Sequence, residues 1–345
     1  MTSGFVQPLL DWYEVHQRRL PWRRDQDAYH VWLSEIMLQQ TRVEAVIPYY
    51  ERFLDACPTV RDLADLPEEK LLKLWEGLGY YSRARNLHKA ARVVCEQYDG
   101  QFPADYAALR ALPGVGDYTA GAVGSIAFGL PVPAVDGNVL RVTARLTNDA
   151  RPIDDTRVKR EMTETVRAVL PEGQSGTFNQ ALMELGATIC LPNGAPKCAD
   201  CPCLPWCEGY AQGSAAMLPA RTPKKARRIE ERTVLVLHDG DRVGLRRRPA
   251  RGLLAGLWEF PAYEGKLSPA QTREKLEQDG FQVREMLSLR PAKHVFSHVE
   301  WHMTGYDIDL ATAGEGLTWV TPARLRGEYA LPSAFRAFLD GLEDA

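Results

Sequence analysis

The chain has 345 residues, of which 45% are hydrophobic and 25% are charged, and its formal net charge is −3. This composition is typical of a globular protein with two or three domains, and it excludes a chain that is basic throughout. Nucleic-acid binding is not excluded, because it depends on local basic patches. No apolar run is long enough to span a bilayer and no secretory signal is present, so we expect a cytoplasmic protein (nucleoid-associated if bacterial) with no membrane partner.

Residues from about 5 to 212 show a helical pattern, with apolar residues at three- and four-residue steps and Pro or Gly at the ends. We therefore predict an all-α domain over residues 1–212. A helix-hairpin-helix unit is predicted near residues 109–128, with Gly114, Val115 and Gly116 in its turn. Glycine permits close backbone approach, and helix-start amides suit a phosphate, so this turn predicts a contact to the DNA backbone. An ordinary tight connection between helices explains the turn equally well.

Five of the seven cysteines fall within residues 190–207. Cys190, Cys198, Cys201 and Cys207 follow the pattern C-x7-C-x2-C-x5-C, and Cys203 is an additional thiol. In a chain expected to be intracellular, such crowding indicates metal rather than disulfides. Four thiolates in one loop suit a [4Fe–4S] cluster or tetrahedral zinc, and one C-x-x-C pair with two single cysteines favours the cluster.

The composition changes after residue 212. Residues 213–228 are rich in small residues, proline and charge, which predicts an exposed linker. Residues 229–345 predict an α/β domain that begins with a β-hairpin whose turn contains Asp-Gly. Further strands are expected within residues 257–263, 292–310 and 317–320, and helices over 270–280 and near 333–342. The expected fold is thus mainly α, with a C-terminal α/β domain.

These features in this order resemble the MutY family of helix-hairpin-helix DNA glycosylases. The resemblance covers essentially the whole chain and is carried by LPWR, SEIMLQQTRV, WEGLGYYSRARNL, LPGVGDYTAGAV, AVDGNVLRV, FNQALMELGA and the cysteine loop. It implies a monomeric base-excision-repair enzyme that removes adenine opposite 8-oxoguanine, or opposite guanine, in double-stranded DNA. It also implies a [4Fe–4S] cofactor. The first cysteine gap is seven residues where the family usually has six, so either the loop bulges or Cys203 replaces a ligand.

Release of adenine requires a proton on the leaving base and a stabilised sugar cation, and two carboxyl groups in different environments can supply both. Glu35 lies in an apolar helical run, where burial would raise its pKa and keep it protonated. Asp136 precedes a helix whose amides favour the ionised form. The resemblance makes Glu35 the acid that protonates adenine N7 and Asp136 the group that stabilises the sugar cation, with Asn138 positioning Asp136 or the water. The residues alone favour a surface helix residue for Glu35 and an N-cap for Asp136, and only the resemblance favours the catalytic roles.

Tyr118 bears on whether the DNA strand is cut. In bifunctional relatives this helix position holds a lysine, which attacks the sugar and forms a Schiff base. A phenol cannot form that imine, so the resemblance implies a monofunctional enzyme that leaves an abasic site. A tyrosine that only packs beside the turn is the simpler interpretation, and the two are compatible.

The resemblance also assigns residues that surround the two bases of the pair. The pocket for the extruded adenine would be lined by Trp22, Arg23, Leu38 and Glu184. The opposite base and its lesion would be contacted by Gln40, Thr41, Leu78, Tyr80, Phe296, Ser297 and His298.

The C-terminal domain resembles a Nudix domain whose catalytic box is degraded. Glu259, Gly265 and Gln278 stand where the Nudix pattern has a glycine and two metal-binding glutamates. Nucleotide hydrolysis is therefore not expected, and the domain would serve to recognise the oxidised guanine.

Two other functions remain open from the sequence. An endonuclease III-like bifunctional glycosylase for oxidised pyrimidines is opposed by Tyr118 in place of lysine and by the added C-terminal domain. A catalytically silent module that binds DNA lesions or zinc is opposed by Glu35 and Asp136.

Overall fold

The computed structural model describes residues 3–223, 226–340 and 342. Contacts divide the chain into two compact units, one of residues 1–65 with 85–223 and one of residues 66–84 with 224–345. The segment 66–84 therefore belongs by its contacts to the C-terminal unit, although it lies inside the predicted all-α region. Lys224 and Lys225 of the predicted linker and Gly341 of the predicted C-terminal helix lie outside the described residues.

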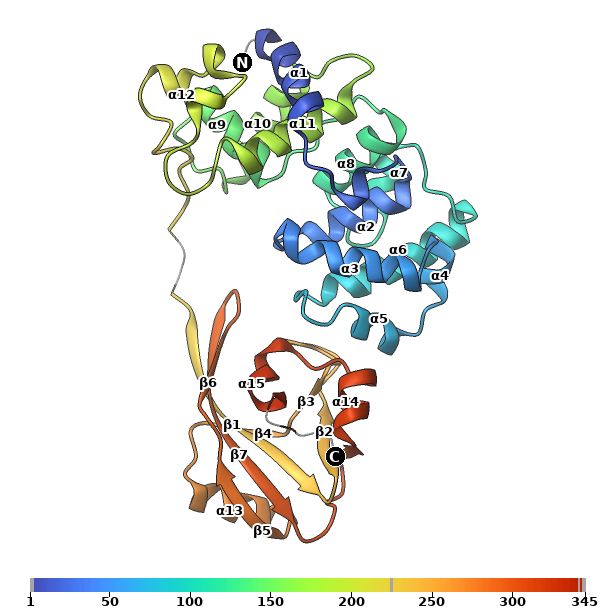
Figure 1. Ribbon diagram of the computed structural model, residues 1–345, viewed down its shortest axis with the longest axis vertical. Helices are drawn as coiled ribbons and strands as arrows, with labels where there is room; N and C mark the ends of the chain where they lie inside the picture. Colours follow the sequence, from blue (N-terminus) through green and yellow to red (C-terminus); the bar gives the residue numbers. More distant parts are fainter. Residues whose placement is uncertain (1–2, 224–225, 341, 343–345) are drawn as a thin grey trace. The chain divides into compact units, whose positions relative to one another are not determined.

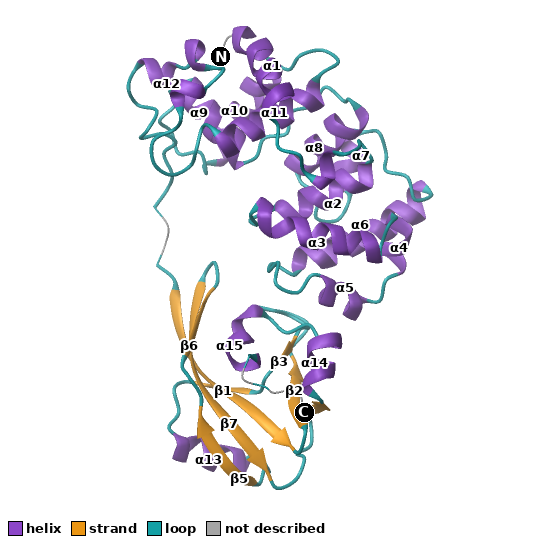
Figure 2. Cartoon of the chain, viewed as in Figure 1, coloured by secondary structure: helices purple, strands orange, loops and turns teal. Residues whose placement is uncertain are grey.

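The N-terminal unit is helical, as the periodicity predicts (Figure 1; Figure 2). Its helices are α1 (Val6–His16), α2 (Ala28–Leu38), α3 (Val43–Ala56), α4 (Val60–Asp65), most of α6 (Ser82–Tyr98), α7 (Tyr106–Ala111), α8 (Asp117–Phe128), α9 (Gly137–Leu146), α10 (Thr156–Arg167), α11 (Ser175–Thr188) and α12 (Glu208–Ala211). Among the described residues, no helix combines the length and apolarity that a membrane span requires.

Helix α2 is a largely buried helix that carries the predicted acid Glu35. Asp27 caps its N-terminus by accepting the backbone N–H groups of Tyr29 (2.8 Å) and His30 (3.3 Å), and most of its residues are buried. It packs against α8, and α8 in turn packs against α11. Gly121 of α8 allows a further close approach, because a Cβ there would lie 2.1 Å from the carbonyl oxygen of Pro133. The chain that leads into α9 therefore passes directly against α8.

The C-terminal unit contains a mixed β-sheet. Its strands are β1 (Arg228–Asp239), β2 (Arg242–Arg247), β3 (Trp258–Glu259), β4 (Ala262–Glu264), β5 (Val283–Ser288), β6 (Ala292–Val295), β7 (Val299–Leu310) and β8 (Thr318–Val320). The main order is β3-β2-β1-β7-β5, and β4, β6 and β8 pair with β1, β7 and β2. The long central strands β1 and β7 are parallel, and the other pairs are antiparallel.

Both faces of this sheet are covered by helices. Alternate residues of the central strands face opposite sides, and apolar side chains on both sides are buried under helices. Val234 and Val236 of β1 face a core that includes Phe338 of α15 (Arg336–Leu339). Leu235 faces the other core with Leu276 of α13 (Pro269–Gln278). Helices α5 (Glu68–Leu74) and α14 (Pro322–Glu328) complete the unit.

Most of the predicted elements of this unit are confirmed. The Asp-Gly hairpin turns at Gly240, whose φ is +61°. The predicted strand region 292–310 forms β6 and β7 with a turn at residues 296–298, and the predicted helix near 333–342 is shorter, a 3-10 turn (Ser333–Phe335) followed by α15. Strand β5 was not predicted, because it is largely exposed and shows no regular alternation of apolar residues.

Candidate active site

Glu35 and Tyr118 form the centre of a group of buried and half-buried polar side chains in the N-terminal unit. Glu35 on α2 is only 7% exposed, and the hydroxyl of Tyr118, in the first turn of α8, donates a hydrogen bond to its Oε2. Burial raises the pKa of Glu35 to about 7, against the opposing effect of the Tyr118 hydrogen bond and with help from the charge of Asp136. Glu35 is therefore protonated in a large fraction of the molecules at neutral pH.

Asp136 is the N-cap of α9. Its Oδ1 accepts the backbone N–H groups of Asn138 (2.9 Å) and Val139 (2.8 Å), and the Asn138 amide donates to its Oδ2 at 2.7 Å. Burial nevertheless raises the pKa of Asp136 above its ordinary value, because desolvation outweighs these hydrogen bonds. The amides favour the ionised form, as expected, but the sequence did not show the opposing desolvation.

The Asn138 side chain is positioned by a hydrogen bond from Arg141. Arg141 donates to Asn138 Oδ1 (3.0 Å), to the carbonyl of Gly186 (2.7 Å) and to the carbonyl of Cys190 (2.8 Å). Gly186 accommodates Asn138, because a Cβ there would lie 2.7 Å from the Asn138 Cβ. Sequence reasoning missed Arg141, although it lies three residues after Asn138 and thus on the same helix face.

Glu184 on α11 is completely buried and is held by two arginines. Its Oε1 accepts from Arg18 Nε (2.7 Å) and its Oε2 from Arg23 Nη2 (2.8 Å). Burial opposes ionisation of Glu184, but the hydrogen bond from Arg18 and the charge of Arg23 outweigh it and lower its pKa. Sequence reasoning missed Arg18, which lies in a run of basic residues with nothing to distinguish it.

An open cavity of about 310 Å³ lies beside two of the predicted adenine-pocket residues, Trp22 and Arg23. Most of its lining side chains are polar: Gln7, Asp11, Tyr13, Glu14, Gln17, Asp25, Gln26, Gln174, Thr177 and Gln180. Trp22 is only 7% exposed, and its ring packs edge-on against Tyr50 at 5.4 Å. Leu38, half-buried at the end of α2, and Glu184 do not line this cavity.

The helix-hairpin-helix turn has the predicted helices on either side, α7 and α8. Gly114 has φ +76°, and a Cβ there would lie 2.6 Å from the Cβ of Asn86, so glycine is required. Val115 is buried, and Gly116 is the N-cap of α8 without a side-chain cap. The first amides of α8 therefore have no side-chain oxygen from their N-cap, which leaves them suited to an anionic group.

The chain turns sharply after α2. Gln40 has φ +57° and is exposed, and Thr41 is half-buried with its hydroxyl 3.3 Å from the carbonyl of Gln39. The Gln39 amide lies 3.4 Å from the hydroxyl of Thr119 on α8, so this turn lies next to the helix that carries Tyr118.

In the C-terminal unit, Tyr80 lies beside the turn between β6 and β7. Tyr80 is 47% exposed, has φ +47°, and its hydroxyl is 2.9 Å from the hydroxyl of Ser297. Ser297 and His298 are exposed, whereas the Phe296 ring packs edge-on against Trp301 at 4.8 Å. The structure thus brings the predicted opposite-base residue Tyr80 to the predicted lesion-reading turn. Leu78, also predicted to contact the base, is only 6% exposed.

The degraded Nudix box holds an ion pair at one of its altered positions. Glu259 is 2% exposed and binds Arg246 (2.9 Å) and Arg248. The two positions that hold metal-binding glutamates in the pattern are Gly265 and Gln278, which carry no carboxylate.

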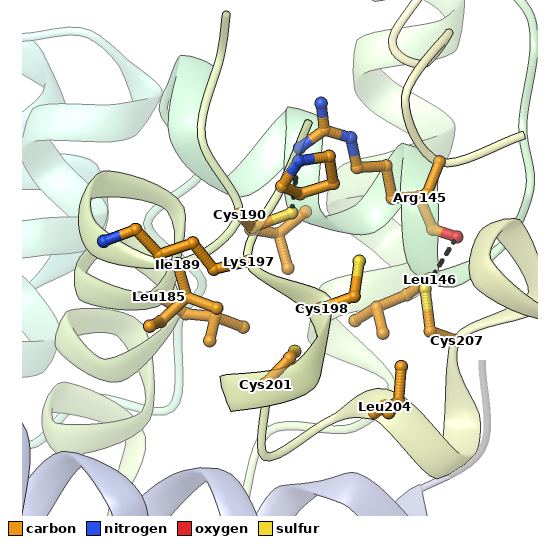
Figure 3. A pocket seen from close by; sticks show the side chains of 13 residues that line it. Arg145, Leu146, Leu185, Ile189, Cys190, Lys197, Cys198, Cys201, Leu204 and Cys207 are labelled. Atoms are coloured by element: carbon orange, nitrogen blue, oxygen red, sulfur yellow. Dashed lines mark hydrogen bonds between the residues drawn. The ribbon is translucent and has the colours of Figure 1, made fainter. Parts of the chain in front are cut away.

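The cysteine loop surrounds a second cavity, shown in Figure 3, whose wall includes Cys190, Cys198, Cys201 and Cys207. Arg145 Nη1 donates to Cys190 Sγ at 3.2 Å. Cys203 is completely buried in the neighbouring hydrophobic core and does not line the cavity. Within the described parts of the chain, no three His, Cys, Asp or Glu side chains are arranged to hold a single metal ion. The four thiols of the cavity fit the donor set of a thiolate-bound cluster.

Comparisons with known proteins identify both parts of the chain. Residues 33–168 match the HhH-GPD superfamily of base excision DNA repair proteins, and residues 232–341 match the NUDIX domain. Among solved structures, a thermostable thymine-DNA glycosylase has a TM-score of 0.54 at 30% identity, covering 61% of this chain and 96% of that one. An endonuclease III–DNA complex has a TM-score of 0.52 at 26% identity, covering 62% and 98%.

Curated relatives extend the match to nearly the whole chain. The human adenine DNA glycosylase is 35% identical, with 93% of this chain and 70% of the relative covered. The adenine DNA glycosylase of Buchnera aphidicola subsp. Baizongia pistaciae is 34% identical, with 86% and 84% covered. The chain therefore belongs to the MutY family of adenine DNA glycosylases, DNA N-glycosylases of base excision repair.

Proposed function

We propose that the protein is a monofunctional glycosylase that removes adenine opposite 8-oxoguanine, and opposite guanine, from double-stranded DNA and leaves an abasic site. The observation that carries this proposal is the buried Glu35, with its pKa raised to about 7, hydrogen-bonded to Tyr118 and electrostatically coupled to Asp136. One carboxyl is thereby equipped to give a proton, and the other to stabilise a cation.

In this mechanism Glu35 donates its proton to N7 of the extruded adenine, and the bond from adenine to the sugar C1′ breaks with its electron pair leaving on the base. Asp136, held by the Asn138 amide, then stabilises the positive charge at C1′. Water adds to C1′ and loses its proton to a carboxylate, which completes hydrolysis. Tyr118 contributes a hydrogen bond but no amine, so no imine forms and the strand is not cut.

Glu184 and its two arginines support the adenine side of this site. Arg23 contacts both Glu184 and the wall of the cavity beside Trp22. The fixed guanidinium groups of Arg18 and Arg23 would hold the Glu184 carboxylate in one position toward the edge of an extruded base.

The cysteine cavity supports a [4Fe–4S] cofactor with Cys190, Cys198, Cys201 and Cys207 as ligands. One C-x-x-C pair with two single cysteines favours the cluster over tetrahedral zinc, whose sites usually have two separated C-x-x-C pairs. When bound, the cluster would supply iron–thiolate bonds that close the loop 190–207. Cys203 is completely buried and does not line this cavity, which supports a packing role.

Recognition of the opposite base is supported by the contact between Tyr80 and Ser297. An aromatic ring at Tyr80 can enter the base stack, and the exposed Ser297 hydroxyl can exchange hydrogen bonds with the edge of 8-oxoguanine. The amides at the start of α8, which receive no side-chain cap from Gly116, suit a DNA phosphate.

The test is single-turnover cleavage of labelled duplexes with one A:8-oxoguanine, A:G, A:T or oxidised-pyrimidine pair, read before and after hot alkali. Breaks in the adenine strand only after alkali, lost in Glu35→Gln, are the expected result. Breaks without alkali, or activity only on the oxidised pyrimidine, would favour an endonuclease III-like lyase. Tight binding without cleavage of any duplex would instead indicate a silent lesion-binding module.

A further inference from the structure

The segment 66–84 makes specific polar contacts with the chain that follows α14, within the C-terminal unit. Glu76 Oε1 accepts the backbone N–H of Leu331 at 2.7 Å. Lys73 Nζ donates to the carbonyl of Tyr329 at 3.1 Å and lies 2.6 Å from Glu76 Oε2. We call this set of contacts, from Lys73 and Glu76 to Tyr329 and Leu331, the docking contact.

The docking contact satisfies backbone groups that would otherwise be costly to bury. Leu331 and its neighbour Ala330 are each 4% exposed, so the Leu331 N–H needs a protein acceptor. The carbonyl of Ala330 accepts the N–H of Trp258 at 3.3 Å, which ties the same stretch to the edge of the sheet. Glu76 therefore binds a stretch of backbone whose position is already fixed by the sheet.

The same segment is rigid between Glu76 and Tyr80. The buried indole of Trp75 donates to the carbonyl of Gly79 at 3.1 Å. Arg83 donates to the carbonyls of Leu78 (2.9 Å) and Gly79 (3.2 Å). These bonds hold the backbone just before Tyr80, whose φ is positive, and the Arg83 N–H donates to the Tyr80 carbonyl at 2.8 Å. A displacement at Glu76 is therefore transmitted to the Tyr80 ring.

We propose that Lys73 and Glu76 are positioning residues for recognition of the opposite base: the docking contact holds the segment 66–84 so that the Tyr80 hydroxyl meets Ser297. This inference rests on the proposed function, in which Tyr80 and Ser297 read the lesion. Neither Lys73 nor Glu76 touches the reacting atoms. Their loss changes discrimination between 8-oxoguanine and guanine, not the bond-breaking step.

The docking contact is tested first without DNA, by hydrogen exchange of the Leu331 amide. Glu76→Leu should accelerate this exchange about tenfold or more, because the lost hydrogen bond to a charged acceptor is worth about 1.5–3 kcal/mol. Glu76→Gln keeps a carbonyl acceptor and should stay close to wild type. Glu69→Gln is the matched control: it removes a carboxylate from the same segment 66–84, where Glu69 makes an exposed ion pair with Arg247 at 3.6 Å. Unchanged exchange in Glu76→Leu would overturn the docking contact.

The second measurement is the ratio of single-turnover excision rates on A:8-oxoguanine and A:G. Glu76→Leu should lower this ratio about tenfold, which corresponds to about 1.4 kcal/mol. Glu76→Gln and Glu69→Gln should keep the ratio within about threefold of wild type. In a Ser297→Ala background, Glu76→Leu should have little further effect, because contacting or coupled residues are non-additive. An additive loss, or an unchanged ratio with accelerated Leu331 exchange, would show a purely structural contact and overturn the proposal. Equal wild-type rates on the two duplexes would refute lesion discrimination itself, and the exchange data would still report the docking contact separately.

Discussion

Replacing Tyr118 by phenylalanine should move the alkaline limit of excision to higher pH. The Tyr118 hydroxyl donates to Glu35 and stabilises its ionised form. The pKa of Glu35, about 7, is the net result of burial, which raises it, and of this hydrogen bond, which lowers it. A hydrogen bond to a charged group is worth about 1.5–3 kcal/mol, and about 1.4 kcal/mol corresponds to one pKa unit. Its loss should therefore raise the pKa of Glu35 by roughly one to two units.

The sign follows from the role of Glu35 as the acid. Excision requires the protonated form, so the rate falls as pH rises through the pKa of Glu35. Wild type should lose activity above about pH 7, and Tyr118→Phe should keep it to roughly pH 8–9. Burial raises the pKa of Tyr118 well above 10, so the tyrosine itself stays protonated over this range.

The assay is the single-turnover excision rate on an A:8-oxoguanine duplex between pH 5 and pH 10 (about the stable range of both strands). Glu35→Gln is the control and should be slower by about 10²–10⁴-fold without an alkaline limb. If the alkaline limb stays in place in Tyr118→Phe, or moves to lower pH, one of two premises is refuted. Either the limb does not report Glu35, or the Tyr118 hydrogen bond does not lower the pKa of Glu35. A uniform fall in rate at every pH would not affect the argument, because only the position of the limb reports the pKa.

Three further changes test other parts of the structure. Asp136→Asn should lower the excision rate at least about 100-fold, while the melting temperature stays near that of wild type because asparagine is an equally good N-cap; an active variant would contradict the role of the charge. Gly121→Ala should lower the free energy of unfolding in urea by about 1–3 kcal/mol, because the new methyl meets the Pro133 carbonyl; unchanged stability would show that the two segments separate easily. Cys203→Ala should retain the iron and sulfide of wild-type protein whereas Cys198→Ala loses them, and the reverse result would make Cys203 a ligand.

Local patterns in the sequence were sufficient for most of the elements and for the family motifs. Helix α8 begins and ends where the glycine turn and the small-residue run predict, at Asp117 and Phe128. The Asp-Gly hairpin and the helix α13 lie where turn chemistry and capping residues place them. These features depend on residues close together in the chain, so a single sequence carries them in full.

The environment of each group was decided only by tertiary structure. Arg18 and Arg23 reach Glu184 across more than 160 positions of the chain, and Glu76 reaches Leu331 across 255. Asp136 has the predicted capping hydrogen bonds, yet its pKa is shifted upward because desolvation by burial outweighs them. The residue types and their positions in the sequence determine which groups can ionise, cap a helix or bind a phosphate. Desolvation and charge pairing depend on which distant segments pack together, and these set the protonation of Glu35 and the position of Tyr80.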